Sequence, residues 1–359
     1  MAMYQSTSSG ADVSVTVGPR TSNGDGYAQL SRSNSVNTIV ELFERAQLTA
    51  DLYAVEHLLL EHTASRSLLI ASASTHTIRS GGKRLRAALA LLAARLGQYS
   101  LPNVIHAAAA VELIQAASLV HDDLVDQAAR RRGRITVHAR WDNDVALMVG
   151  DYFFALAAAE MGRSPDSRII GYYAHAVQTI VEGELSPVTV VEPTELALEQ
   201  YYYKTGAKTA SLFEAACKSG MAAGGGSEQQ IAALGRYGFD LGVAFQIIDD
   251  VLDFTGDEQT LGKPAGNDLR QGTITLPLIL ALSRTKSPTL RTFLEHAQPS
   301  DAQVEAVISE VLASGGVDAA IAEARRFISQ AVAQLAEFPP SVAHRGLVEL
   351  AMFVLDRKA

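Results

Sequence analysis

Apolar side chains recur every three to four residues along most of this chain, beginning near Val36 and continuing almost to its last residue. This spacing places the apolar positions on one face of an α-helix. Glycine and proline mark the joins between such stretches, for example at Gly81, Gly97 and Pro339. The pattern predicts helices over residues 36–63, 65–79, 84–97, 101–128, 141–162, 166–189, 195–223, 228–254, 274–285, 288–296, 301–314, 316–337 and 341–357.

No segment alternates apolar and polar side chains for long enough to propose a β-sheet. Alanine is abundant, aromatic residues make up only 6% of the chain, and runs of β-branched residues are short. These features favour an all-α fold, and we predict one large helical bundle over residues 36–359. Residues 1–35 are rich in Ser, Thr, Asn and Gly and have few large apolar side chains, so we predict a disordered tail there.

The net charge of −9 and the isoelectric point near 5.5 disfavour nucleic acid or an acidic membrane as a partner. The single cysteine, Cys217, excludes an internal disulfide and fits a reducing compartment, so we expect a cytoplasmic protein. The most apolar stretch, around residues 145–159, contains Asp151, and no transmembrane span is therefore predicted. The beginning of the chain lacks the basic and apolar segments of a secretory signal.

An Asp-Asp-x-x-Asp pattern occurs twice, more than a hundred residues apart. The two copies are Asp122, Asp123 and Asp126, and Asp249, Asp250 and Asp253. Residues four apart lie on the same face of a helix, so the first and last carboxylates of each copy share a face and repel each other unless a cation lies between them. The Leu, Ile and Val residues around both copies argue against two solvated acidic turns. We therefore predict two acidic helices that hold divalent cations and a bound anion.

Clusters of basic residues accompany the aspartates. They are Lys83, Arg84 and Arg86 after a glycine pair, Arg130, Arg131 and Arg132 after the first acidic motif, and Lys204, Lys208 and Lys263 further along. Arginine binds phosphate with two parallel hydrogen bonds, and Mg²⁺ is usually held by one or two carboxylates plus substrate phosphates. Two acidic and two basic groups thus predict two phosphate-bearing ligands, one held through metals and one held directly. A set of salt bridges between the neighbouring Arg and Asp runs is the alternative interpretation.

Taken together, these motifs resemble those of the trans-isoprenyl diphosphate synthases, the polyprenyl synthetase family. The matching segments, in the family's order, are GGKRLR, DDLVD followed by RRG, GAKTASLF, FQIIDDVLD and GKPAGNDLRQGTITLP. The resemblance extends from about residue 40 to the end of the chain. It implies a helical bundle of the isoprenoid synthase type with a central cavity, a homodimer, and Mg²⁺-dependent head-to-tail (1'-4) trans condensation of an allylic diphosphate with isopentenyl diphosphate.

The resemblance also implies roles for individual residues. The metal ligands would be Asp122 and Asp126 for two ions and Asp249 for a third, with Asp123, Asp250 and Asp253 in support. The allylic diphosphate would be bound by Arg131, Lys208 and Lys263, with Thr209 and Gln246 lining the reacting carbons. Isopentenyl diphosphate would be bound by Lys83, Arg86, Gln115 and Arg132. Three Mg²⁺ ions are expected with substrate bound, and Mn²⁺ is expected to substitute for them.

Three positions depart from the usual residues of the family: Gln115 replaces a frequent His, while Ala87 and Ile135 replace Pro. None of these changes removes a ligand, so we expect only local adjustment. His121 precedes Asp122 and invites assignment as a base. Adjacent helical residues point about 100° apart, however, so we expect His121 to pack or to support a neighbour.

Product length is expected to depend on residues about one helical turn before the first acidic motif. Family members that make short products carry bulky aromatics four or five positions upstream, where this chain has Ser118 and Ala117. We therefore predict a medium- or long-chain product beyond twenty carbons, with Ile114, Phe153 or Phe154 as floors deeper in the cavity. A geranylgeranyl or farnesyl diphosphate synthase is the alternative.

Three other classes of protein fit the sequence less well. A class I terpene cyclase would carry Asn/Asp-x-x-Ser/Thr-x-x-x-Glu as its second metal motif, whereas this chain has DDVLD. A non-catalytic synthase subunit is disfavoured because every charged position that the chemistry needs is present. A di-iron bundle would need Glu-x-x-His pairs, which the sequence lacks.

Overall fold

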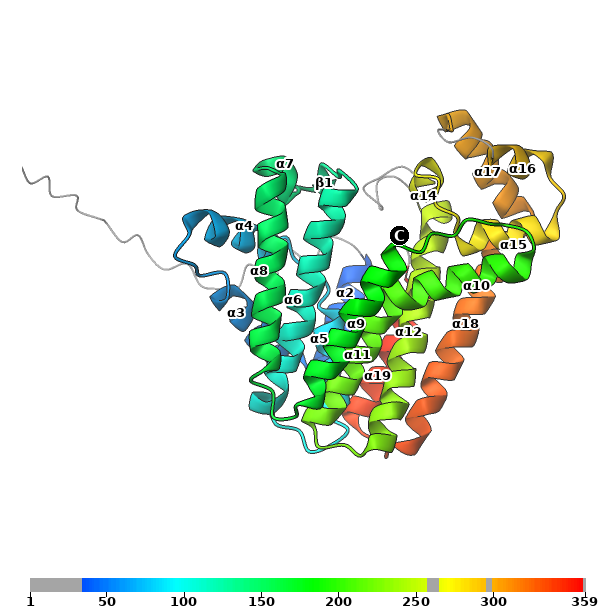
Figure 1. Cartoon of the computed structure of the whole chain (residues 1–359). Helices are drawn as coiled ribbons and strands as arrows, with labels where there is room; N and C mark the ends of the chain where they lie inside the picture. Colours follow the sequence, from blue (N-terminus) through cyan, green and yellow to red (C-terminus); the bar gives the residue numbers. More distant parts are fainter. Residues whose placement is uncertain (1–33, 257–264, 295–298, 358–359) are drawn as a thin grey trace, which may run out of the picture.

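The computed structural model describes residues 34–256, 265–294 and 299–357. Nearly all of the secondary structure in this part is helical, and the longest helices run side by side as a bundle (Figure 1). A single two-stranded antiparallel ladder, with Arg130 opposite Ile135 and Arg131 opposite Arg134, is the only sheet in the described ranges. The prediction of an all-α fold is confirmed. The predicted tail over residues 1–35 lies outside the described residues except for its last two positions, which begin the first helix.

The elements follow in chain order. They are α2 (Asn34–Arg45), α3 (Thr49–Glu61), α4 (Leu68–Arg79), α5 (Leu85–Ala94), α6 (Leu101–Val125), β1 (Arg130–Arg131), β2 (Arg134–Ile135), α7 (Val137–Arg140), α8 (Asn143–Met161), α9 (Arg168–Glu184), α10 (Thr194–Thr205), η1 (Gly206–Ala210), α11 (Ser211–Ala223), α12 (Glu228–Thr255), α14 (Asn267–Arg270), α15 (Leu276–Arg284), α16 (Pro288–Phe293), α17 (Asp301–Ala313), α18 (Gly316–Gln334), η2 (Leu335–Glu337) and α19 (Val342–Leu355).

The structure differs from the predicted helices at several places; for example, the predicted helix 166–189 ends at Glu184. Three further differences change the course of the backbone. The first predicted helix, 36–63, is two helices, because the chain turns at Gln47, whose φ is +56°. The predicted helix 195–223 contains a π-helical turn over 206–210, which inserts extra chain into an otherwise regular helix. The predicted helix 101–128 ends at Val125 and leads into the β1–β2 hairpin. All three differences depend on backbone geometry that side-chain periodicity does not encode.

The core is centred on α5, in which every residue except Arg86 is buried. Small residues let the helices around it approach closely. A side-chain carbon added at Gly220 of α11 would come within 2.1 Å of the carbonyl oxygen of Ala90 on α5, and one at Gly224 within 2.7 Å of that of Ala94. The backbones of α5 and α11 are therefore in direct contact along a glycine–alanine seam.

The two helices that carry the acidic motifs, α6 and α12, are the longest in the described part of the chain. By length and composition each could cross a membrane, but 61% of the apolar window of α6 and 67% of that of α12 is buried inside the bundle. Their apolar character is thus accounted for largely by packing against neighbouring helices.

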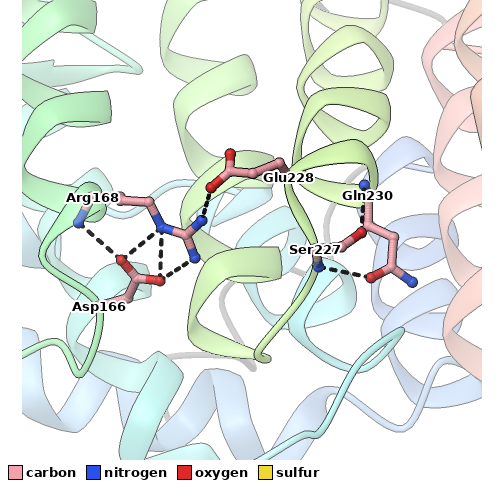
Figure 2. Close-up of polar contacts among 5 residues, drawn as sticks. All are labelled: Asp166, Arg168, Ser227, Glu228 and Gln230. Carbon is pink, nitrogen blue, oxygen red and sulfur yellow. Dashed lines mark hydrogen bonds and ion pairs between the residues drawn. The ribbon is translucent and has the colours of Figure 1, made fainter.

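Polar contacts fix the end of the bundle at which α9 and α12 begin (Figure 2). Arg168 donates to both carboxylate oxygens of Asp166 and also pairs with Glu228 at the start of α12. Ser227 and Gln230 form a capping box that satisfies the first backbone N–H groups of α12. The helix α12 runs from this capped end to the acidic motif in its last turns, so Asp249 lies at the opposite end of the helix.

Candidate active site

The two acidic motifs occupy corresponding places, the C-terminal ends of α6 and α12. Their six carboxylates divide into two groups by burial. Asp122 is half-buried, and Asp126 and Asp249 are exposed. Asp123, Asp250 and Asp253 are only 7%, 4% and 3% exposed. One expectation from the sequence needs correction here: the apolar flanks do not enclose the first motif, because Val125 is 81% exposed.

The buried carboxylates hold neighbouring protein groups. Asp123 accepts a hydrogen bond from Nε of Arg131 at 2.6 Å, although burial still raises the pKa of this carboxyl above its usual range. Asp253 accepts from the backbone N–H of Asp268 at 3.0 Å and, through its carbonyl, from Gly266 at 2.7 Å. Asp123 thus orients the Arg131 side chain, and Asp253 fixes the segment that leads into α14.

A continuous hydrogen-bonded network links α10, α12 and the π-helical turn. The Tyr201 hydroxyl donates to Oδ2 of Asp250 at 2.6 Å, and Nε2 of Gln246 donates to Oδ1 of Asp250 at 2.9 Å. The Thr209 hydroxyl donates to Oε1 of Gln246 at 2.8 Å. Burial raises the pKa of Asp250 to about 8, against the opposing effect of these two donors. Sequence reasoning missed Tyr201, although it lies on the buried side of α10, two turns before Lys208.

The π-helical turn η1 brings the two acidic ends to one region. Lys208 forms an ion pair with Glu184 at 2.6 Å, and the carboxylates of Asp122, Glu184 and Asp126 raise its pKa even though burial lowers it. The next residue, Thr209, contacts α12 through Gln246. Consecutive residues therefore face the first and the second acidic helix. Glu184 was not predicted, because a lone Glu at the end of a helix carries no distinguishing sequence signal.

The basic side of the site is formed by Lys83, Arg86 and Arg132. Burial, reinforced by the positive charges of Arg357 and Arg132, lowers the pKa of Lys83 to about 8, while Asp249 acts in the opposite direction. Lys83 thus lies near both Arg132, which follows the first acidic motif, and Asp249, which belongs to the second. The guanidinium carbon of Arg86 lies 4.7 Å from the centre of the Phe213 ring. Burial lowers the pKa of Arg86 to about 10.

Backbone geometry positions two further arginines. Arg132 has a φ of +51° and donates to the carbonyl of Gly81, which ties the β1–β2 hairpin to the glycine pair before α5. Arg84, grouped with Lys83 and Arg86 in the sequence, instead turns inward and forms ion pairs with Glu56 and Glu112. It therefore holds α3, α5 and α6 together.

Arg357, at the end of the described chain, is a third residue that sequence reasoning missed. Its Nη2 lies 3.2 Å from Oδ1 of Asp249, and its guanidinium lies 4.3 Å from the ring centre of Phe245. Its Nη1 is buried without a hydrogen-bond partner. A single basic residue near a chain end has no pattern around it, so only the fold could bring it to the site.

One predicted binding residue, Gln115, lies at the margin of this region. Gln115 is half-buried on α6, two turns before Asp122 and on the same helix face. Lys263 lies outside the described residues. Ala87, where the family usually has Pro, donates its backbone N–H to Oε1 of Glu112 at 3.0 Å, a hydrogen bond that Pro could not make. Ile135 offers its carbonyl to Nε2 of His76 at 2.8 Å.

The residues proposed to limit product length differ in burial. Ile114, Ala117 and Phe153 are enclosed, with 1%, 0% and 0% exposure, whereas Ser118 and Phe154 are partly open. His121 turns toward α8, and its Nε2 lies 3.1 Å from the carbonyl oxygen of Leu147. Gly150 makes room for it, since a side-chain carbon there would come within 2.0 Å of the His121 ring. This geometry agrees with the packing role expected of His121.

The carboxylates fit metal ions that are shared with a substrate. Across the described residues, no three His, Cys, Asp or Glu side chains are arranged to hold a metal ion by themselves. Asp126 and Asp249 nevertheless expose carboxylate oxygens, and Asp122 beside them is only half-buried. Mg²⁺ keeps several waters and is usually completed by substrate phosphates, so one or two accessible carboxylates on each side suit it better than a closed cage.

Comparison with known proteins finds a matching family and several similar chains. The sequence profile of the family described as Polyprenyl synthetase matches residues 68–311. The chain is 37% identical to "Heptaprenyl diphosphate synthase component 2" of Geobacillus stearothermophilus, covering 86% of this chain and 97% of that protein. It is 35% identical to "All-trans-nonaprenyl-diphosphate synthase (geranyl-diphosphate specific)" of Rhodobacter capsulatus, covering 87% and 96%. The crystal structure of a Caulobacter crescentus polyprenyl synthase complexed with calcium and isoprenyl diphosphate superposes with a TM-score of 0.82 and 36% identity, covering 91% and 99%.

Proposed function

The chain belongs to the polyprenyl synthetase family, and from this premise we propose how its residues bind and join two isoprenoid diphosphates. It is a prenyl diphosphate synthase, a transferase of prenyl groups. We propose that it elongates an allylic diphosphate with isopentenyl diphosphate to a medium- or long-chain product beyond twenty carbons. The relatives that make heptaprenyl and nonaprenyl diphosphate support this length, as do the small side chains of Ala117 and Ser118.

The observation that carries the proposal is the placement of η1 between the two acidic helix ends. Lys208 interacts with Asp122 and Asp126, while Thr209 is hydrogen-bonded to Gln246 and through it to Asp250. An allylic diphosphate bound here would meet carboxylate-held cations from both helices. We propose that Asp122, Asp126 and Asp249 hold three Mg²⁺ ions, for which Mn²⁺ can substitute, and that Arg131, Lys208 and Lys263 bind the remaining phosphate oxygens.

Isopentenyl diphosphate would occupy the basic side of the same region. Lys83, Arg86 and Arg132 converge there, Gln115 lies nearby on α6, and the tie from Arg132 to Gly81 holds the two basic segments together. Arg357 adds a buried guanidinium at the border between this side and Asp249. Charge-assisted hydrogen bonds from these groups would fix the diphosphate and leave the carbon chain directed at the allylic ligand.

The family is metal-dependent, and bound Mg²⁺ would supply positive charge that stabilises the departing diphosphate. The protein's own cations act in the same sense: Lys208 and Arg131 neutralise charge that develops as the allylic C–O bond breaks. The Thr209 hydroxyl donates its hydrogen to Gln246, so the lone pairs of its oxygen remain available to stabilise the allylic cation. The isopentenyl double bond then attacks this cation, and we propose that the proton lost afterwards passes to the departing diphosphate.

The assembly and location are also proposals. We propose a homodimer, the assembly implied by the resemblance to the family, and a cytoplasmic location, which the single cysteine favours. The "component 2" in the name of the Geobacillus relative points to a second chain in that protein. Light scattering on the purified chain separates these cases. A dimer that is active alone supports the homodimer, and an inactive monomer that gains activity with a second chain contradicts it.

The function is tested by incubating the purified protein with Mg²⁺, labelled isopentenyl diphosphate and allylic primers of increasing length. We expect incorporation of label into products longer than twenty carbons, and loss of incorporation in Asp122→Asn and Asp249→Asn. Products that stop at fifteen or twenty carbons would contradict the proposed length but keep the reaction. Release of a cyclic hydrocarbon instead would contradict the reaction itself.

A further inference from the structure

A second basic region lies outside the candidate active site, in a pocket of about 480 Å³ between α4, β2 and α7. Its walls carry Arg79, Arg134, Arg140 and His76, and Leu68 and Ala71 form part of its rim. None of these residues belongs to the acidic helix ends or to the groups proposed to bind the two substrates. In Figure 1, α4 and α7 lie beside α8, on the side of the bundle away from α15 and α18.

The three guanidinium groups in this pocket are not neutralised by carboxylates. Arg79, Arg134 and Arg140 are all exposed, and none forms an ion pair within the described ranges of the chain. By contrast, Arg84 and Arg131, on the neighbouring segments, are each paired with a buried carboxylate. In a chain with a net charge of −9, three unpaired cations around one hollow form a local positive field that favours an anion.

The side chains of Arg140 and His76 are held in place before any ligand binds. Arg140 stacks on the ring of Trp141 at 4.7 Å and donates to Nδ1 of His76 at 3.1 Å. His76 therefore carries its hydrogen on Nε2 and donates it to the carbonyl of Ile135 at 2.8 Å. The His76 ring also lies edge-on to Trp141, with ring centres 5.6 Å apart. Arg140 thus loses little side-chain freedom on binding, which favours affinity.

We propose that this pocket is a binding site for a phosphate group. Three arginines on three different elements can each direct two N–H donors at one tetrahedral oxyanion, a geometry that guanidinium meets better than a single ammonium. The phosphate can come from inorganic phosphate or diphosphate in solution, or from the headgroup of an anionic lipid. The rim residue Leu68, which is 84% exposed, would contact the acyl region in the second case.

A phosphate bound here would act on the hairpin that serves the active site. Arg134 lies on β2, opposite Arg131 on β1, and Arg132 in the same hairpin is tied to Gly81 just after α4. An anion bridging Arg79 on α4 to Arg134 on β2 would add a further tie to those that His76 makes with Ile135 and Arg132 makes with Gly81. Occupation of the pocket is therefore expected to lower the KM for isopentenyl diphosphate and to leave kcat nearly unchanged. This inference concerns a separate pocket and stands whether or not the proposed product length is right.

The test uses the full-length protein and inorganic phosphate, followed by isothermal titration. The variant Arg79→Ala/Arg140→Ala removes two of the three guanidiniums. Arg131→Ala/Arg132→Ala removes the hairpin cations of the active site, and Arg325→Ala, an exposed arginine on α18, controls for loss of charge alone. We expect the first variant to lose one class of phosphate sites, with affinity weakened at least about tenfold, because hydrogen bonds to charged groups are individually worth about a factor of ten or more. We expect the other two variants to keep that class.

The inference is overturned if the Arg79→Ala/Arg140→Ala variant binds phosphate like the wild type, or if the Arg131→Ala/Arg132→Ala variant loses all phosphate binding. A parallel experiment with vesicles of phosphatidylcholine, with and without phosphatidylglycerol, identifies the source of the phosphate. Binding to the anionic vesicles that depends on Arg79 and Arg140 assigns the site to a lipid headgroup. Binding of free phosphate without vesicle binding assigns it to a soluble ion. Circular dichroism of each variant verifies that its helical fold is retained.

Discussion

A buried carboxyl group of the second acidic motif is tolerated because it has hydrogen-bond partners. Asp250 is almost fully buried, yet both of its carboxylate oxygens accept hydrogen bonds, one from Tyr201 and one from Gln246. A buried carboxylate without such donors would cost several kcal/mol. The acidic motif can therefore place one of its carboxylates in the core while Asp249 beside it remains exposed.

Tyr201→Phe removes one of the two donors to Asp250 and changes little else. We expect a loss of about 1–3 kcal/mol in the free energy of unfolding, the usual cost of leaving a buried hydrogen-bonding group without its partner. We also expect a fall in kcat, because Asp250 holds Gln246 and Gln246 holds Thr209. Urea denaturation and steady-state kinetics measure the two effects. Tyr203→Phe, at a half-exposed ring on the same helix, should change neither, and an equal loss in both variants would contradict the role given to Tyr201.

Lys83 should make substrate binding dependent on pH. Its pKa is lowered to about 8 by burial and by the nearby Arg357 and Arg132, so the ammonium is charged below that pH and loses its proton as the pH rises through it. The KM for isopentenyl diphosphate is therefore expected to rise as the pH passes 8. In Lys83→Arg the charge persists, because arginine does not titrate in this range, and the rise should disappear. A rise of the same size in both proteins would assign the effect to another group.

At the scale of whole elements, close helix approach depends on glycine at a few positions. Gly220→Ala would push a methyl group into the carbonyl of Ala90, which lies on the backbone of α5 and cannot move aside. We expect a loss of about 1–3 kcal/mol or more in the free energy of unfolding, as for other overpacked cores. Gly171→Ala, also within a helix but with nothing within 4 Å of the new methyl group, should stabilise the fold by up to about 1 kcal/mol. Similar melting temperatures for the two variants would contradict the proposed close contact between the backbones of α5 and α11 at Gly220.

The wall of α6 before the acidic motif offers a second prediction at this scale. Ser118 is partly exposed and Ala117 is enclosed, so Ser118→Phe is expected to shorten the product with little loss of stability. Ala117→Phe is also expected to shorten the product, but at a cost of about 1–3 kcal/mol from overpacking. Sizing of radiolabelled products and thermal unfolding measure both effects. Unchanged chain length in both variants would place the hydrocarbon elsewhere.

For the molecule as a whole, metal binding and substrate binding should be coupled. Since no group of three metal-binding side chains is preformed in the described residues, Mg²⁺ alone is expected to change the melting temperature little. Mg²⁺ together with diphosphate should raise it clearly, because a ligand at 100 times its Kd adds about 2.7 kcal/mol to folding. Asp126→Asn is expected to weaken this shift. A full shift with Mg²⁺ alone would contradict shared coordination by protein and phosphate.

The sequence by itself determined the helical class, the positions of most helices, and the two acidic motifs with their basic neighbours. These are local properties, since apolar periodicity and residue spacing are set within one or two turns of the chain. It also indicated which carboxylates could hold cations, because spacing alone puts Asp122 and Asp126, or Asp249 and Asp253, on one helix face.

Only the tertiary structure decided which of these side chains remain accessible and which bind other parts of the protein. Asp123 is paired with Arg131, Arg84 turns away to Glu56 and Glu112, and Tyr201 and Arg357 enter the site from α10 and from the end of the described chain. The break at Gln47 and the π-helical turn at Gly206–Ala210 also escaped the pattern. Except for the pairing of Asp123 with Arg131, which are 8 residues apart, these contacts join residues at least 28 positions apart in sequence. Periodicity within a segment carries no information about such contacts, because they exist only once the helices have packed.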